Sequence, residues 1–262
     1  MPEPRSSTTP TSVAEVSDDE RAGIQRRTLR TLMGGIVPGG AAMSGAYSSA
    51  AILGEELSGS EALGGVAASC MTMGAALTAI PLARFMTARG RRPGIAGGYG
   101  VAMGGAGLCF LAVLTGWYPL LAMGILCVGL GYSANMAARF AAADLADEPG
   151  TAIGTLIWAS TFGSVLGPIL GFGPARALAT TIGLDELAGP YLFSIVMFGL
   201  AATIVGTRLR PDPLVVAGGL GRSEERVPIR AFVRPVLRSR DGMLAVGSMM
   251  TGHVVMVGVM TM

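Results

Sequence analysis

The sequence predicts an all-α membrane protein, with six transmembrane helices followed by a polar linker and a seventh helix. Three observations support this fold class. Hydrophobic residues make up 51% of the chain and charged residues only 14%, whereas soluble domains contain about 25% charged residues. The mean hydropathy is +0.56. From residue 31 onward, uncharged runs follow one another, each long enough to cross a hydrocarbon core of roughly 30 Å.

The first region, residues 1–30, is polar and precedes every apolar run. Pro, Ser and Thr dominate its start, and charged residues dominate its end. A secretory signal peptide has an apolar segment soon after a short basic start, and this region has none. We therefore expect a disordered cytoplasmic tail, with a short basic helix near Arg26, Arg27 and Arg30.

The uncharged runs contain the predicted membrane spans. The longest run, 93–138, is long enough for two crossings of about 20 residues each. TGWYP at 115–119 divides it, because Gly and Pro end helices and because Trp and Tyr favour the membrane interface. The predicted spans are 31–53, 62–84, 94–114, 118–140, 151–172, 189–208 and 243–262. This gives a six-span region at 31–208, a cytoplasmic linker at 209–241, and a seventh span within 242–262.

The distribution of arginine predicts the orientation. Every basic residue is Arg, with five in the tail, four at 84–92, one at 139, one at 176 and eight at 208–240. If successive spans alternate in direction, eighteen arginines lie on one side and Arg176 alone lies on the other. Cytoplasmic loops carry the excess of positive charge. We therefore expect a multi-pass protein of the bacterial plasma (inner) membrane with a cytoplasmic N-terminus.

The linker has two possible roles. Arginines at 226, 230, 234 and 238 alternate with apolar residues, and a spacing of four places them on one face of an amphipathic helix that could lie on anionic lipid. Pro228 and Pro235 would interrupt such a helix, so a solvated basic linker that only sets the topology fits equally well. No polar flank follows the seventh span, and we expect the sequence to be a fragment.

Two segments carry a family resemblance. The loop at 83–94 reads ARFMTARGRRPG, and the fifth span contains GSVLGPILG at 163–171. Together with six spans, a basic linker and a further span, these segments resemble the major facilitator superfamily, whose members have two six-helix halves around a central cavity. The resemblance implies that 31–208 form the N-terminal half. It also implies that the seventh span begins a C-terminal half, which is missing here and would be a partner.

In the loop, Gly90, Arg91 and Arg92 match the end of the family motif G-x-x-x-D-R-x-G-R-R. Thr87 replaces the acidic residue, which in the family locks the two halves through charge contacts. The resemblance therefore implies either that the two halves are locked differently here or that this lock matters less. A positive-inside loop with no further role is the alternative interpretation.

The fifth span matches the family pattern G-x-x-x-G-P-x-x-G through Gly163, Gly167, Pro168 and Gly171, followed by Phe172 in place of a final Gly. Glycines four apart allow two helices to approach closely. Pro168 removes a backbone donor and bends the helix. In the family, this pattern is associated with exporters that exchange substrate for protons.

The resemblance also suggests which residues line a cavity. The candidates are polar or aromatic residues of spans one, four, five and seven: Tyr47, Tyr132, Asn135, Trp158, Thr161 and His253. Aromatic rings offer stacking or cation–π contacts, and His253, with an ordinary pKa of about 6.5, could handle protons. Each candidate also fits an ordinary contact between helices. Arg139, near the end of span four, is expected to pair with Asp144 or Asp147.

We therefore expect a secondary transporter that works by alternating access and exports a small, largely apolar organic molecule by proton antiport. An uptake or facilitated-diffusion carrier and a non-transporting membrane sensor or assembly subunit are the alternatives. The expected partners are the lipid bilayer, the substrate and protons. Without a Walker loop, a metal-spaced cluster or more than one His, we expect no enzyme activity, cofactor or metal. Without a folded basic domain, we expect no nucleic acid partner.

Overall fold

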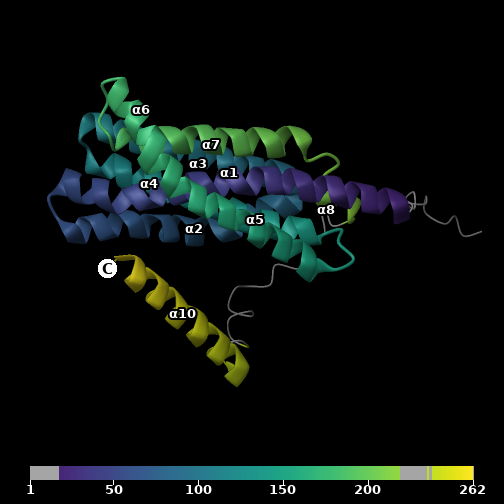
Figure 1. Ribbon diagram of the computed structural model, residues 1–262. Helices are drawn as coiled ribbons and strands as arrows, with labels where there is room; N and C mark the ends of the chain where they lie inside the picture. Colours follow the sequence, from purple (N-terminus) through teal and green to yellow (C-terminus); the bar gives the residue numbers. More distant parts are fainter. Residues whose placement is uncertain (1–17, 219–234, 236–237, 262) are drawn as a thin grey trace, which may run out of the picture. The chain divides into compact units, whose positions relative to one another are not determined.

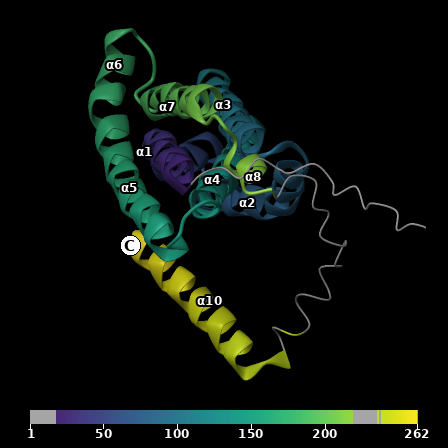
Figure 2. The same cartoon turned by 90° about the vertical axis from the view of Figure 1, so that its right-hand side faces the viewer.

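The computed structural model describes residues 18–218, 235 and 238–261. The chain divides into one unit that extends to Gly221 and a second that begins at Arg222. The first unit is a bundle of long helices (Figures 1 and 2). The described part of the second contains the long helix α10, at Arg240–Thr261.

In the described residues, all regular structure is helical. The bundle comprises α1 (Asp18–Ser58), α2 (Glu61–Arg89), α3 (Arg91–Thr115), α4 (Tyr118–Ala143), α5 (Pro149–Leu170), a π-helical turn (Gly171–Ala175), α6 (Arg176–Thr181), α7 (Ala188–Arg208) and α8 (Pro213–Val216). Each predicted span falls largely on one long helix. The predicted break at TGWYP is confirmed: Gly116 ends α3 with a φ of +68°, and α4 begins at Tyr118.

Five of these helical segments are long and apolar enough to cross a membrane: α2, α3, α4, Pro149–Thr181 and Ala188–Val216. Their outward faces carry large apolar side chains, such as Leu77, Ile169 and Val196, each about 60% exposed. Monomeric soluble proteins rarely expose so much contiguous apolar surface. The predicted all-α membrane fold is therefore confirmed. Neither α1 nor α10 is among the five, so membrane crossing at 31–53 and 243–262 stays a prediction.

The structure differs from the sequence prediction at the N-terminal tail. Residues 18–30, placed in a disordered tail, form the first turns of the continuous helix α1. Two contacts order this part: Gln25 Nε2 donates to Ala142 O at the end of α4 (2.8 Å), and Thr28 is buried against the bundle. The expected basic helix near Arg26 is thus part of α1. Residues 1–17 lie outside the described residues.

Helix α1 occupies the middle of the bundle and contacts α2, α4, α5 and α7 (Figure 1). Its central residues Ile36, Ala42 and Ala46 have no exposed surface. Helix α3 lies against α4 and α7, and the large buried rings of Tyr99 and Phe198 join α3 to α7. The core therefore sits where α1, α3, α4 and α7 meet, whereas α2 and α5 leave wide apolar faces uncovered.

Only the start and the end of the predicted linker fall within the described residues. Its start contains the short helix α8. The amphipathic helix considered around residues 226–238 lies for the most part outside the described residues. That helix and the solvated linker therefore both stay predictions.

Candidate functional site

The glycines of α5 form a close contact with α1. A Cβ added to Gly163 would collide with Val37 O, and one added to Gly167 would collide with Ala41 O and lie 2.8 Å from Ser44 Cβ. The two backbones therefore touch with no side chain between them. The close approach expected at Gly163 and Gly167 is present, and we call it the α1–α5 seam.

Pro168 leaves a carbonyl oxygen without its helical donor, and α1 supplies a replacement. Pro has no N–H, so Ser164 O, four residues earlier, loses its partner. Ser44 Oγ donates to Ser164 O at 2.9 Å. Beyond Leu170 the helix changes to a π-turn, in which a Cβ on Gly171 would make ordinary contact with Pro190 of α7, at 3.7 Å. The same Cβ would lie 3.8 Å from Gly45 Cα of α1, so the third glycine of the pattern lies between α7 and α1.

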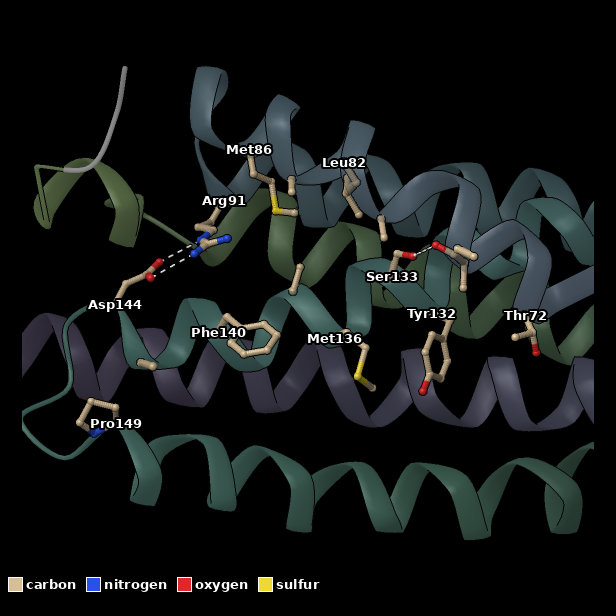
Figure 3. Close-up of a pocket in the computed structure, with 16 residues that line it drawn as sticks. Thr72, Leu82, Met86, Arg91, Tyr132, Ser133, Met136, Phe140, Asp144 and Pro149 are labelled. Carbon is tan, nitrogen blue, oxygen red and sulfur yellow. Dashed lines mark hydrogen bonds and ion pairs between the residues drawn. The ribbon is translucent and has the colours of Figure 1, made fainter. Parts of the chain in front are cut away.

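At one end of the bundle, Arg91 joins α3 to α4. Its Nε donates to Asp144 Oδ2 at 2.9 Å and its Nη2 to Asp144 Oδ1 at 3.2 Å (Figure 3). Both side chains are mostly buried, at 20% and 16% exposed. Two parallel charge-assisted bonds fix orientation as well as distance. The pair therefore holds the start of α3 against the end of α4.

A second carboxylate, Asp212, lies at the same end. It accepts hydrogen bonds from the backbone N–H groups of Arg91 (3.1 Å) and Arg92 (2.8 Å). Its Oδ1 also accepts from Leu214 N, at 3.0 Å, and so caps α8. The first N–H groups of a helix lack internal partners and favour negative charge. Asp212 therefore caps two helices at once.

Gly90 makes the approach of Asp212 possible. It lies between α2 and α3 with a φ of +101°, and a Cβ there would collide with the Asp212 carboxylate. Next to it, Arg92 Nε donates to Gly206 O of α7 at 2.7 Å. The Gly90–Arg92 segment thus contacts the ends of α4 and α7 and the start of α8. We call Gly90, Arg91, Arg92, Asp144 and Asp212 the loop cluster.

Thr87 makes only a local contact. Its exposed hydroxyl donates to Arg84 O within the same turn, at 2.9 Å. Among the described residues of the first unit, the carboxylates that bind this loop are Asp144 and Asp212, from distant parts of the sequence. An acidic residue at position 87 is therefore not needed to order the loop inside this unit.

A groove of about 770 Å³ runs between α2 and α4 and reaches the loop cluster. Its lining is mostly apolar and includes Tyr132, Met136 and Phe140 of α4, with Arg91 and Asp144 at one end. In Figure 3, Tyr132 and Met136 extend to one side of α4 and Ser133 to the other. Ser133 Oγ donates to Ala75 O of α2 at 2.9 Å and so ties the two helices together.

The predicted cavity residues of the first unit do not gather in this groove. Tyr132 lines it. Asn135 is only 1% exposed, and its Nδ2 donates to Tyr99 Oη (3.3 Å) and Ile36 O (3.4 Å). Trp158 is exposed on α5 and stacks edge-on against Phe162. Of the other three candidates, Tyr47 is half-buried on α1 and Thr161 is exposed on α5. His253 belongs to α10, and its side chain lies outside the described residues.

The expected pairing of Arg139 is wrong. Asp144 binds Arg91 instead, and Asp147 is exposed. Arg139 Nη2 donates to Ser160 Oγ of α5 at 3.1 Å. Helix geometry explains the difference. Arg139 and Asp144 are five residues apart, and residues at this spacing point in different directions from a helix.

The contacts of Asp212 and Ser44 do not follow from the sequence. Asp212 precedes Pro213, and an N-cap Asp followed by Pro is a signal for the start of a helix. That signal predicts α8, but not the contact with a loop about 120 residues earlier. Ser44 could have been sought because Pro168 needs a donor for Ser164 O, although the sequence does not say which helix provides it.

The fold and this site define a multi-pass α-helical membrane protein whose helices meet around a groove. A family model of the Major Facilitator Superfamily matches residues 32–262. The chain belongs to that superfamily. It is 30% identical over 252 residues to the uncharacterized MFS-type transporter YddS, and 28% identical over 252 residues to the uncharacterized MFS-type transporter YdeG, both from Bacillus subtilis (strain 168).

Each alignment covers 94% of this chain and 58% of the relative. The chain thus spans less than two thirds of the length of these relatives. No solved structure matches.

Proposed function

We propose that the chain is the N-terminal part of a secondary transporter that works by alternating access and exports a small, largely apolar organic molecule in exchange for protons. In this proposal residues 31–208 are the first half, 209–241 a cytoplasmic linker, and 242–262 the first span of the second half. The protein would lie in the bacterial plasma (inner) membrane with its N-terminus in the cytoplasm. Membership of the superfamily supports transport as the activity.

The observation that carries the proposal is the groove of about 770 Å³ that ends at the Arg91–Asp144 pair. Its apolar lining suits an apolar substrate, since ligand sites are mostly apolar with few polar groups. Breaking a charge pair inside a membrane protein is costly. The loop cluster would therefore hold this end of the bundle closed until the other half of the transporter moves.

The α1–α5 seam supports movement as well as closure. Smooth glycine surfaces let one helix shift along another without side chains that interlock. Pro168 and the π-turn after Leu170 interrupt the regular hydrogen bonds of α5, and such features allow a helix to bend. We infer that α5 changes its curvature when the groove opens.

Inverted membrane vesicles test this function even while the substrate is unidentified. The vesicles would be prepared from cells that express the chain with any further residues its reading frame encodes, and acidified inside. Small apolar compounds would then be added one at a time. A substrate of the antiporter should release protons, which a pH-sensitive dye detects, and vesicles without the protein should show no release.

Two results would contradict the proposal. If a compound crosses the vesicle membrane through the protein at a rate indifferent to the proton gradient, antiport is wrong and a facilitated-diffusion carrier remains. If no compound of a broad panel moves, although the protein is present and folded, the non-transporting sensor or assembly subunit replaces the transporter. An inward direction of net transport would favour the uptake carrier.

A further inference from the structure

Arg139 of α4 lacks a charged partner among the described residues. Its Nη2 donates to Ser160 Oγ of α5 at 3.1 Å, while its Nε is buried without a hydrogen-bond partner. Ser160 is 7% exposed, and its own hydroxyl proton is used on Ile157 O, at 2.7 Å. The serine oxygen is therefore a neutral acceptor, which leaves the guanidinium charge uncompensated.

Arg91 shows what such a group does when an anion is present. Its Nε and Nη2 both bind the Asp144 carboxylate. In Arg139, Nη2 donates to a neutral hydroxyl and Nε has no hydrogen-bond partner. Burying part of a charged side chain without a charged partner is costly. The contrast indicates that the guanidinium of Arg139 suits an oxyanion partner.

The surroundings of Arg139 are aromatic and apolar. Tyr132 lies seven residues earlier on α4 and Met136 three residues earlier, so all three share one helical face. Figure 3 shows Tyr132 and Met136 extending to the same side of α4. A ligand that binds there would meet a cation at one end and apolar surface along its length. This combination suits an amphiphilic anion better than a neutral molecule.

We propose that Arg139 forms an anion-binding subsite of the transport cavity, which takes the carboxylate of a small amphiphilic substrate. Nε and Nη2 of Arg139 would bind the two oxygens side by side, as Arg91 binds Asp144, and Ser160 would give up its bond to Nη2. This inference rests on the proposed function and narrows its substrate class. The buried Nε becomes reachable when α4 and α5 separate, and α5 contacts α4 less than it contacts α1.

The phosphate of an anionic lipid has the same chemistry as a substrate oxyanion, so the test must separate the two. Radiolabelled 2-naphthoate would be the probe, with 2-naphthamide as its neutral counterpart, bound to the protein in nanodiscs. One set of nanodiscs would contain phosphatidylcholine alone, and another would include phosphatidylglycerol. The variants would be Arg139→Gln, Arg139→Lys and Ser160→Ala, with Arg84→Gln as the control that removes an exposed charge.

We expect 2-naphthoate to bind the unaltered protein at least about tenfold more tightly than 2-naphthamide, since a charge-assisted pair contributes that much affinity. Arg139→Gln should remove this preference, and Arg84→Gln should keep it. Arg139→Lys should retain only part of it, because a lysine lacks the two-pronged geometry. Ser160→Ala should preserve or strengthen it, because Nη2 is then free.

Equal binding of the two probes, or an unchanged preference in Arg139→Gln, would overturn the subsite. If phosphatidylglycerol displaces 2-naphthoate from the unaltered protein but not from Arg139→Gln, the site belongs to a lipid headgroup and the substrate assignment is wrong. Should Arg139→Gln fail to fold, Arg139→Lys decides the question: a reduced preference for 2-naphthoate supports the subsite, and an unchanged preference overturns it. Binding needs no flux, so loss of transport with retained binding would count against the proposed function alone.

Discussion

Gly90 joins α2 to α3 with a backbone conformation that other residues rarely adopt. Its φ is +101°, and a Cβ there would also collide with the Asp212 carboxylate. We therefore expect Gly90→Ala to lower the free energy of unfolding by about 1–3 kcal/mol. Thermal unfolding in detergent, followed by circular dichroism, measures this change.

Gly97 provides a matched control for Gly90. It lies within α3, and nothing within 4 Å would meet an added Cβ. Replacing a glycine with alanine inside a helix stabilises it by roughly 0.5–1 kcal/mol. Gly97→Ala should therefore raise the unfolding temperature. If both variants change it by the same amount, the specific constraint at Gly90 is wrong.

Asp212 is the second residue whose role can be measured directly. Asp212→Ala leaves the N–H groups of Arg91, Arg92 and Leu214 without their acceptor. Loss of a helix cap costs about 0.5–2 kcal/mol, and we expect the upper end because one carboxylate serves two helices. Hydrogen exchange should quicken at the amides of residues 91 and 92.

Asp147→Asn tests whether the loss of a negative charge alone explains the lower stability and the faster exchange expected of Asp212→Ala. Asp147 is exposed in the loop before α5, close to the same end of the chain's first unit. Its substitution should leave both the unfolding temperature and the exchange at residues 91 and 92 unchanged. Faster exchange in this control would show that general electrostatics, rather than the Asp212 contact, protects these amides.

At the scale of elements, the α1–α5 seam should be the contact least tolerant of added volume. In Gly163→Ala and Gly167→Ala, the new methyl group would press on a backbone carbonyl of α1, which cannot rotate away. Overpacking of this kind costs about 1–3 kcal/mol. Gly154→Ala, on the same helix with open space around it, is the control. The measurement is thermal stability together with monodispersity in size-exclusion chromatography. Equal behaviour of all three variants would show that the seam does not limit stability.

The elements also show which features a sequence can predict. The positions of the long helices follow from uncharged runs, because length and polarity alone decide which segments suit a membrane. The seam follows from the spacing of Gly163 and Gly167 on one helical face. The Arg91–Asp144 pair does not follow, because it depends on how far α3 and α4 rotate relative to one another. The capping of α3 by Asp212 depends on the tertiary fold in the same way.

At the scale of the whole molecule, the opposite ends of the bundle differ in charge. The loop cluster and α8 lie at one end, whereas α6, with the Arg176–Glu186 ion pair, lies at the other (Figure 1). The excess of arginine at the first end predicts that it faces the cytoplasm. The orientation of each end in living cells is therefore a direct test of the proposed topology.

Cysteine labelling tests this orientation. The background would replace the three native cysteines with alanine: Cys70, Cys109 and Cys127. A single new cysteine would then be introduced by Thr87→Cys near the loop cluster or by Ile182→Cys after α6, both exposed positions. A membrane-impermeant maleimide should label Ile182→Cys in intact cells, and should label Thr87→Cys only after the membrane is opened. Labelling of Thr87→Cys in intact cells would mean that the bundle is inverted. Labelling of both would mean that the number of spans between them is wrong, because an odd number places the two positions on opposite sides.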